Sequence, residues 1–162
     1  MELTTEQQSV FDGLMLSDAN LELSIRGRQK NARFSLTSKH NSFVRRTVDA
    51  LPFDWAPVNE RHFYDSRTNK NYHRCTGRTR VDGWFTSQYH RWYKNGTKIV
   101  PNDLSLTSIC ILWWYLGDGH LARKRSRPNY RRVILATDSF SDSEKQWLKD
   151  RLQQLVGENV YV

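Results

Sequence analysis

The sequence predicts an α+β protein made of two related halves, in which a helix is followed by a hairpin of antiparallel strands. The first observation is an apolar stripe at helical spacing over residues 10–15, followed by two short runs that alternate between apolar and polar side chains. The second is that Leu16-x-Asp18-x-x-Leu21 is matched 100 residues later by Leu116-x-Asp118-x-x-Leu121. A repeat of that length is too long for a solenoid unit and indicates duplicated half-domains about a pseudo-twofold axis.

Local signals define the elements of the first half. Residues 4–8 place a glutamine three positions after a threonine, which is a capping-box pattern, so a helix is expected to begin there and to run out at residues 18–20. The alternating runs 21–25 and 33–37 predict a hairpin with one apolar face and one polar, cationic face. The remaining expected elements are a helix over 41–51 ended by Pro52, strands at 62–64 and 72–80, and an aromatic-rich helix over 84–93.

The second half repeats this order in part. A helix is expected to open at Leu104 and to run to residue 116, before Gly117-Asp118. A cationic hairpin with strands at 121–124 and 131–136 follows, and Ser141-x-x-Glu144 is a second capping box that opens a last helix. The expected half-domains are residues 1–103 and, incomplete relative to the first, 104–162.

Composition indicates the kind of partner. The 162 residues include 25 lysines and arginines against 17 aspartates and glutamates, which gives a net charge of +8. With 38% hydrophobic residues this is a folded domain with a cationic surface, not a disordered basic tail, and its natural partner is a polyanion, most often nucleic acid. No apolar run approaches the ~18–20 residues of a membrane span, so no membrane partner is expected.

The two cysteines indicate the compartment. Cys75 and Cys110 lack the spacing of metal ligands and are expected to be reduced thiols. The N-terminal residues are acidic and polar, unlike a signal peptide. We therefore expect an intracellular, reducing compartment: the cytoplasm of a bacterium or of a phage-infected cell, or an organelle matrix.

Each repeat places a carboxylate at the end of an apolar helix, where the helix dipole disfavours negative charge unless a cation compensates. Two such ends side by side would bring Asp18 and Asp118 together with the carbonyl oxygens of Ser17 and Gly117, and small residues, Gly13 among them, would allow the close approach. Hard oxygen ligands of this kind suit Mg²⁺ or Mn²⁺. Either acid alone is better interpreted as an ordinary helix-ending residue; their duplication in one register favours a metal site.

These residues carry a resemblance to a family. Phe11-Asp-Gly-Leu-Met-Leu-Ser-Asp18-Ala and Ile111-Leu-Trp-Trp-Tyr-Leu-Gly-Asp118-Gly resemble the two motifs of the LAGLIDADG homing endonucleases, specifically the single-chain, two-motif, intron-encoded kind. Residues 98–104 resemble the segment that leads into the second motif helix in that group. The matches are loose at Asp12, which occupies the first small position, and at Trp113-Trp114, which replace the central Gly-Leu.

The resemblance implies a LAGLIDADG endonuclease fold: pseudo-twofold αββαββα halves whose antiparallel, saddle-shaped sheets lie on duplex DNA, here with an abridged second half. It implies that Asp18 and Asp118 bind divalent metal for phosphodiester hydrolysis, and that Lys98 is the basic residue beside the metal. From position alone, Lys98 would be a solvated lysine beyond the Asn95-Gly96 turn. His120 is expected to touch phosphate or solvent and not to be a ligand.

Three basic blocks coincide with the expected hairpins and predict a DNA-facing sheet. Residues 33, 35 and 37 alternate onto one face, where arginine, serine and threonine can reach phosphates and base edges. The expected DNA contacts are Arg26, Arg28, Lys30, Arg33, Ser35, Thr37, Arg74, Arg78, Arg80, Arg123, Lys124, Arg125, Arg127 and Arg132. The aromatic residues of the helix over 84–93 are expected to belong to the core.

The sequence leaves alternatives open. Lys98 follows Asp18 by 80 residues, and the same spacing from Asp118 would reach position 198, beyond Val162. The chain is therefore a fragment, is completed by a partner chain, or works with an abridged second half. The main hypothesis is a metal-dependent homing endonuclease that acts on double-stranded DNA. The others are a non-catalytic binder on the same scaffold, either an intron RNA maturase or a DNA-binding regulator, and a basic RNA-binding protein with a coincidental repeat.

Overall fold

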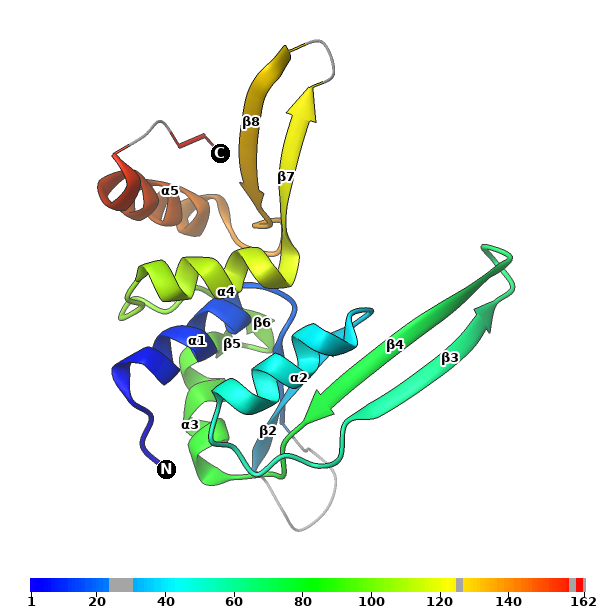
Figure 1. Cartoon of the computed structure of the whole chain (residues 1–162). Helices are drawn as coiled ribbons and strands as arrows, with labels where there is room; N and C mark the ends of the chain where they lie inside the picture. The colour runs from blue at the N-terminus through cyan, green and yellow to red at the C-terminus, as the bar shows by residue number, and fades with distance from the viewer. Residues whose placement is uncertain (24–30, 125–126, 158–159, 162) are drawn as a thin grey trace.

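The computed structural model describes residues 1–23, 31–124, 127–157 and 160–161 (Figure 1). In chain order the elements are α1 (Thr5–Leu16), β1 (Asn20–Leu23), β2 (Ala32–Ser38), α2 (Asn41–Ala50), β3 (Asn59–Asp65), β4 (Lys70–Arg78), α3 (Gly83–Trp92), β5 (Tyr93–Lys94), β6 (Thr97–Lys98), α4 (Ser108–Asp118), β7 (Gly119–Lys124), β8 (Arg127–Leu135) and α5 (Asp142–Val156).

The architecture is α+β with antiparallel sheets, as predicted. The first half holds a four-stranded sheet of order β1-β2-β4-β3, against which α2 and α3 pack, and its hairpin β3–β4 projects from the body of the molecule (Figure 1). In the second half β7 pairs with β8, and α5 follows. Helices α1 and α4 run side by side through the centre (Figure 1). Among the residues described, no helix is long and apolar enough to span a bilayer.

Side-chain caps fix where the helices begin. Thr4 accepts a hydrogen bond from the N–H of Gln7, whose side chain in turn accepts one from the N–H of Thr4, so the expected capping box is confirmed. The second capping box, at Ser141, is confirmed as well. The expected start of the other motif helix at Leu104 is wrong, because Thr107 caps the N–H of Cys110 and α4 begins at Ser108.

The two motif helices approach closely because small residues line their contact. A Cβ atom added at Gly13 would lie 2.9 Å from the Cβ of Trp113, and one added at Gly117 would lie 2.6 Å from the Cβ of Ser17. Real side chains do not tolerate such separations, so both positions require glycine. The expectation that small residues would bring the helix ends together is confirmed.

The hydrophobic core lies mainly in the first half, between its sheet and the helices. Phe11 and Phe34 are fully buried and their rings lie 5.6 Å apart, with Phe53 against both. From α3, Phe85 and Trp92 are buried to within 1% of complete burial, which confirms that this helix contributes to the core. The core therefore fixes α1, and with it the position of the residues that follow its last turn.

An ion-pair network, buried at Asp12 and exposed at Asp103, joins α1 to α3 and to the segment before α4. The Arg91 guanidinium donates to Asp12 at 2.7 Å and to Asp103 at 2.9 Å. Asp12 is only 3% exposed and also accepts a hydrogen bond from Gln8. This network explains how an acid can occupy a motif-helix position where the family pattern has a small residue, since an unpaired carboxylate could not be buried there.

Candidate active site

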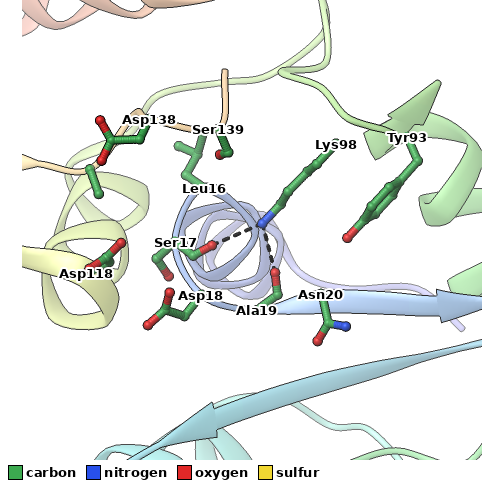
Figure 2. A pocket seen from close by; sticks show the side chains of 11 residues that line it. Leu16, Ser17, Asp18, Ala19, Asn20, Tyr93, Lys98, Asp118, Asp138 and Ser139 are labelled. Carbon is green, nitrogen blue, oxygen red and sulfur yellow. Dashed lines mark hydrogen bonds between the residues drawn. The ribbon is translucent and has the colours of Figure 1, made fainter. Parts of the chain in front are cut away.

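Asp18 and Asp118 lie together where α1 and α4 end. Asp18 is two residues beyond the last residue of α1, and Asp118 is the last residue of α4. Both side chains line one open cavity of about 340 Å³, and Figure 2 shows them at adjacent helix ends. The backbone N–H groups of Ser17 and Ala19 both donate to the carbonyl of Leu14, which turns the chain sharply and presents Asp18 to the cavity.

The two carboxylates form an electrostatically unfavourable pair. Burial raises the pKa of Asp18, the negative charge of Asp118 raises it further, and Lys98 opposes both effects. The net effect is a raised pKa, so one lysine does not fully compensate the two acids. Such a pair in an open cavity has the electrostatics of a cation site.

Lys98 reaches into the same cavity from β6. Its ammonium group donates to the carbonyl oxygens of Ser17 at 3.0 Å and of Ala19 at 2.8 Å (Figure 2). Burial lowers the pKa of Lys98 to about 8, and the charge of Asp18 opposes that shift. Lys98 is therefore not the solvated lysine that its place after a turn would predict by itself. It is a half-buried cation held against the turn that presents Asp18.

The turn before Lys98 positions this lysine beside the cavity. Asn95 and Gly96 both have positive φ, at 53° and 78°, as a tight two-residue hairpin loop requires. The hairpin pairs Tyr93 with Lys98, and the Tyr93 hydroxyl accepts a hydrogen bond from the N–H of Leu21. The β5–β6 hairpin is thereby fixed to the start of β1, next to the cavity.

The donor set fits Mg²⁺ or Mn²⁺. Asp18 and Asp118 supply carboxylate oxygens, the Gly117 carbonyl lies at the same helix end, and the Ser17 carbonyl keeps one lone pair beside its bond to Lys98. Within the described part of the chain, no three His, Cys, Asp or Glu side chains are grouped to hold a metal. Mg²⁺ usually takes one or two carboxylates and completes its shell with waters and substrate phosphates. These four residues therefore remain our predicted ligands.

A second open cavity, of about 500 Å³, shares both acids. Leu116, Gly117 and Gly119 line this second cavity. Their repeat equivalents Leu16, Ser17 and Ala19 line the first cavity. The pseudo-twofold relation extends further. Residues 136, 138 and 139 line the first cavity, and their repeat equivalents 37, 39 and 40 line the second. The acid pair thus lies between two related but chemically unequal cavities, with Asp138 in one where Lys39 lies in the other.

Strand register places five of the expected DNA contacts of the first half on one face. Ser35 pairs with Arg78 and Thr37 with Thr76, so side chains at alternate positions of β2 and β4 point the same way. The residues on this face are Arg33, Ser35, Thr37, Arg74 and Arg78. The alternation that the sequence predicted for this hairpin is therefore present in the sheet.

An acid that the sequence analysis overlooked lies within this cationic face. Glu22 of β1 is paired with Arg33 at 2.7 Å and lies 3.7 Å from Arg78. Arg78 also donates to Ser35, which is only 3% exposed. Ser35 therefore contacts Arg78 and not solvent, and Glu22 holds Arg33 and Arg78 in place. The signal for Glu22 was its cross-strand position opposite Arg33.

The other expected DNA contacts have different surroundings. Arg80 lies beyond the last residue of β4 and pairs with Asp54 at 3.2 Å. In the second hairpin Arg132 pairs with Ala122, and Arg123 pairs with Arg131, so Arg123 and Arg132 point to opposite faces. Lys124 and Arg127 are paired strand residues next to an irregularity in register. Arg26, Arg28, Lys30 and Arg125 lie outside the described residues.

Comparison with known proteins agrees with this fold. The model of the LAGLIDADG DNA endonuclease family matches residues 8–159, so the chain belongs to that family. Among solved structures, the homing endonuclease I-WcaI bound to its DNA recognition sequence resembles it with a TM-score of 0.84 at 17% sequence identity, covering 98% of this chain and 71% of that one. The shared fold is an α+β LAGLIDADG fold with antiparallel sheets.

Two curated relatives are longer than this chain. The uncharacterized protein MJ1098 of Methanocaldococcus jannaschii is 27% identical over 96% of this chain and 58% of its own length. The cytochrome b mRNA maturase bI2 of Debaryomyces hansenii is 24% identical over 90% of this chain and 55% of its own length. The chain thus spans little more than half the length of these relatives.

Proposed function

We propose that this chain is a site-specific endonuclease of the homing type, which hydrolyses phosphodiester bonds of double-stranded DNA at an intron or intein insertion site with Mg²⁺ or Mn²⁺. The observation that carries the proposal is the cavity in which Asp18, Asp118 and the Lys98 amine meet. Binding alone does not require two acids aimed at the place of a polyanion, because they repel it.

Each residue has a distinct part in this proposal. Asp18 and Asp118 hold the divalent metal, with the carbonyls of Ser17 and Gly117 as further oxygen donors. When bound, such ions activate a water and stabilise the leaving 3′ oxygen of an in-line displacement. Lys98 places a compact positive charge where negative charge develops on the phosphate, and its two carbonyl acceptors keep the amine in position before substrate arrives.

The cationic sheet face supplies DNA binding. Arg33, Arg74 and Arg78 can reach phosphates and base edges, and Glu22 fixes the orientation of two of them. The proposal extends to Thr37, to Arg132 on the second hairpin, and to the basic residues outside the described part of the chain.

The test is incubation with a supercoiled plasmid that carries the intronless insertion site, with and without Mg²⁺. Nicking or linearisation at one site, dependent on metal and lost in Asp18→Asn, would support the proposal. Site-specific binding with no cleavage in Mg²⁺ or Mn²⁺ would overturn it and favour a DNA-binding regulator.

A second candidate function is RNA maturation. The observation in its favour is the similarity to the cytochrome b mRNA maturase bI2 over 90% of this chain. A maturase would use the cationic surface to stabilise folded intron RNA. Acceleration of splicing of its own intron that is unchanged in Asp18→Asn, together with absence of DNA cleavage, would select this alternative.

We further propose that a second polypeptide chain completes the second half. Leu121 and Val133 are cross-strand partners that are 36% and 60% exposed, whereas the repeat-equivalent Leu21 and Phe34 are 4% and 0% exposed. An open two-stranded sheet with an uncovered apolar pair is a ready surface for further strands and a helix. Without them, the unequal cavities favour an enzyme that nicks one strand.

Size-exclusion mass, read together with a plasmid assay that separates nicked from linear product, tests the completion of the second half. A complex larger than the monomer, or predominant nicking by a monomer, would support it. A stable monomer that cuts both strands at equal rates would overturn it.

An intracellular, reducing compartment is likewise a proposal. Cys75 and Cys110 are both buried free thiols. Burial raises the pKa of the Cys110 thiol to about 12, so this cysteine would stay protonated and unreactive at neutral pH.

A further inference from the structure

Two exposed aromatic rings lie side by side on the projecting hairpin β3–β4. Phe63 and Tyr72 are directly opposite each other in the strand register, and their rings are stacked with centroids 5.8 Å apart and planes 27° apart. Phe63 is 43% exposed and Tyr72 is 39% exposed. Exposed rings of this size indicate a contact surface when they occur together and not singly.

These rings share the cationic face of the sheet. Residues 61, 63, 72 and 74 point to one side of the hairpin, and continued alternation along β4 places Arg78 and Thr37 on that side as well. The Arg74 guanidinium lies over the Phe63 ring, 5.8 Å from its centroid. Phe63, Tyr72 and Arg74 also line the second cavity, together with the two acids. The aromatic pair therefore belongs to the surface proposed to face DNA.

Duplex DNA offers few apolar groups to such a pair. In the major groove, which admits a two-stranded ribbon, the base pairs present hydrogen-bond donors and acceptors and one apolar group, the C5-methyl of thymine. We propose that Phe63 and Tyr72 form an apolar contact for thymine methyl groups, which makes this hairpin select A·T pairs at the positions it covers. The inference rests on the proposed DNA binding and adds a specificity determinant to it.

The surroundings of the rings favour a methyl group over an unpaired base. Stacking of an unpaired base needs an open ring face. The Phe63 ring is already stacked by Tyr72 and approached by the Arg74 guanidinium. The arginines on either strand next to the rings, Arg61 and Arg74, are suited to phosphates of an intact duplex. The edge of the Phe63 ring, with Arg61 and Arg74 beside it, is therefore suited to contact a thymine methyl group at the floor of the major groove.

The experiment starts from the DNA site selected by the full chain from a random duplex library. Hydroxyl-radical footprinting, with a cleavage reagent tethered at the hairpin tip, identifies the base pairs under β3–β4. Each thymine there is then replaced by deoxyuridine, which differs only in lacking the methyl group. We expect affinity to fall by about fourfold for each methyl that contacts the rings, from the value of one buried methylene group.

Two variants separate this contact from general effects. Phe63→Ala is expected to bind thymine and deoxyuridine duplexes equally, with an unchanged salt slope because no phosphate contact is lost. Tyr64→Ala is the matched control: Tyr64 is 57% exposed on the same strand but points to the opposite face, so its removal should preserve the discrimination.

The outcomes distinguish this inference from the proposed function. Selective duplex binding by the wild-type chain with no loss on deoxyuridine substitution, or discrimination that survives in Phe63→Ala, would overturn the methyl contact and leave the endonuclease proposal intact. Failure to bind any duplex selectively would overturn both. Because the deoxyuridine comparison uses the wild-type chain, the result does not depend on how well a variant folds.

Discussion

Glu144 of α5 accepts a hydrogen bond from the backbone N–H of Val100 at 2.7 Å. Its other carboxylate oxygen accepts the N–H of Ser141 at 2.8 Å, which closes the capping box of that helix. Val100 lies two residues after Lys98. One carboxylate therefore caps the start of α5 and also fixes the segment that follows Lys98.

The Glu144 bonds predict a pH-dependent contribution to stability. Burial opposes ionisation of Glu144, but the hydrogen bonds from Ser141 and Val100 outweigh it and lower its pKa in the folded state. A lowered carboxyl pKa contributes stability above the unfolded-state pKa, and that contribution is lost as pH falls through the folded-state pKa. We expect Glu144→Gln to lower the free energy of unfolding by about 1 kcal/mol at pH 7.

Urea unfolding at pH 7, 5 and 3 measures this difference. It should shrink as the pH falls from 7 to 3 and the Glu144 carboxylate is protonated, because its advantage over the neutral amide is then lost. The exposed Glu2→Gln change is the control and should have little effect at any pH. A difference that is the same at pH 3 and pH 7 would contradict the assignment.

The acid pair predicts separate effects on cleavage and stability. Asp18→Asn and Asp118→Asn should each reduce cleavage by at least about a hundredfold and leave DNA affinity largely unchanged. Because each change removes like-charge repulsion, the metal-free variant should unfold at a higher temperature than the wild type. Millimolar Mg²⁺ should raise the wild-type midpoint but not that of Asp18→Asn. Wild-type cleavage rates in either variant would exclude the metal-site assignment.

Lys98 is expected to matter to one strand more than to the other. Lys98→Met keeps the length of the side chain but removes the charge and leaves the Ser17 and Ala19 carbonyls without their donor. Cleavage of one end-labelled strand of a duplex should slow by at least about tenfold more than cleavage of its complement. The exposed Lys94→Met in the paired strand is the control and should change neither. Equal slowing of both strands would argue against two unequal cavities.

The cationic sheet face predicts salt-sensitive DNA binding. Each phosphate contact contributes about −0.9 to the slope of log affinity against log salt concentration, so Arg74→Ala should flatten the slope by about one contact. Arg151→Ala, on α5 and stacked on Trp147, should leave it unchanged. A wild-type slope near zero would show that this face does not bind DNA.

The contact between the motif helices can be tested with two glycines. Gly117→Ala would place a Cβ 2.6 Å from the Ser17 Cβ, so we expect a loss of about 1–3 kcal/mol in the free energy of unfolding and weaker cleavage. Gly83→Ala, also in a helix but with nothing within 4 Å of the new Cβ, should be neutral or slightly stabilising. Ser17→Gly should rescue Gly117→Ala. Lack of rescue would mean that the helix ends do not meet as described.

Sequence predicted those features that local chemistry or the repeat determines. The capping boxes at Thr4 and Ser141 depend on residues three positions apart, and the proximity of Asp18 and Asp118 follows from a repeated helix end. The start of α4 was misplaced because Leu104 has helical spacing with the apolar run but is buried in the preceding segment, while Thr107 supplies the cap.

Other features depend on long-range packing that no local pattern contains. Asp138 reaches the cavity only because β8 returns the chain beside α4, and the hydrogen bond from Lys98 to the Ser17 carbonyl joins residues 81 positions apart. The opposite orientations of Arg123 and Arg132 depend on hairpin register, which a count of basic residues does not provide. Charge density predicted a binding surface, whereas register decides which arginines are on it.

The Asp12–Arg91–Asp103 network limits how this scaffold can be recombined. Arg91 belongs to the last helix of the first half, Asp12 to the first motif helix, and Asp103 to the connection into the second half. A chimera that takes α1 from one homologue and α3 from another would separate a buried acid from its guanidinium, at a cost of about 3–5 kcal/mol. Module exchange in this protein must therefore transfer α1, α3 and the segment that carries Asp103 together, whereas exchange of the strands leaves this network intact.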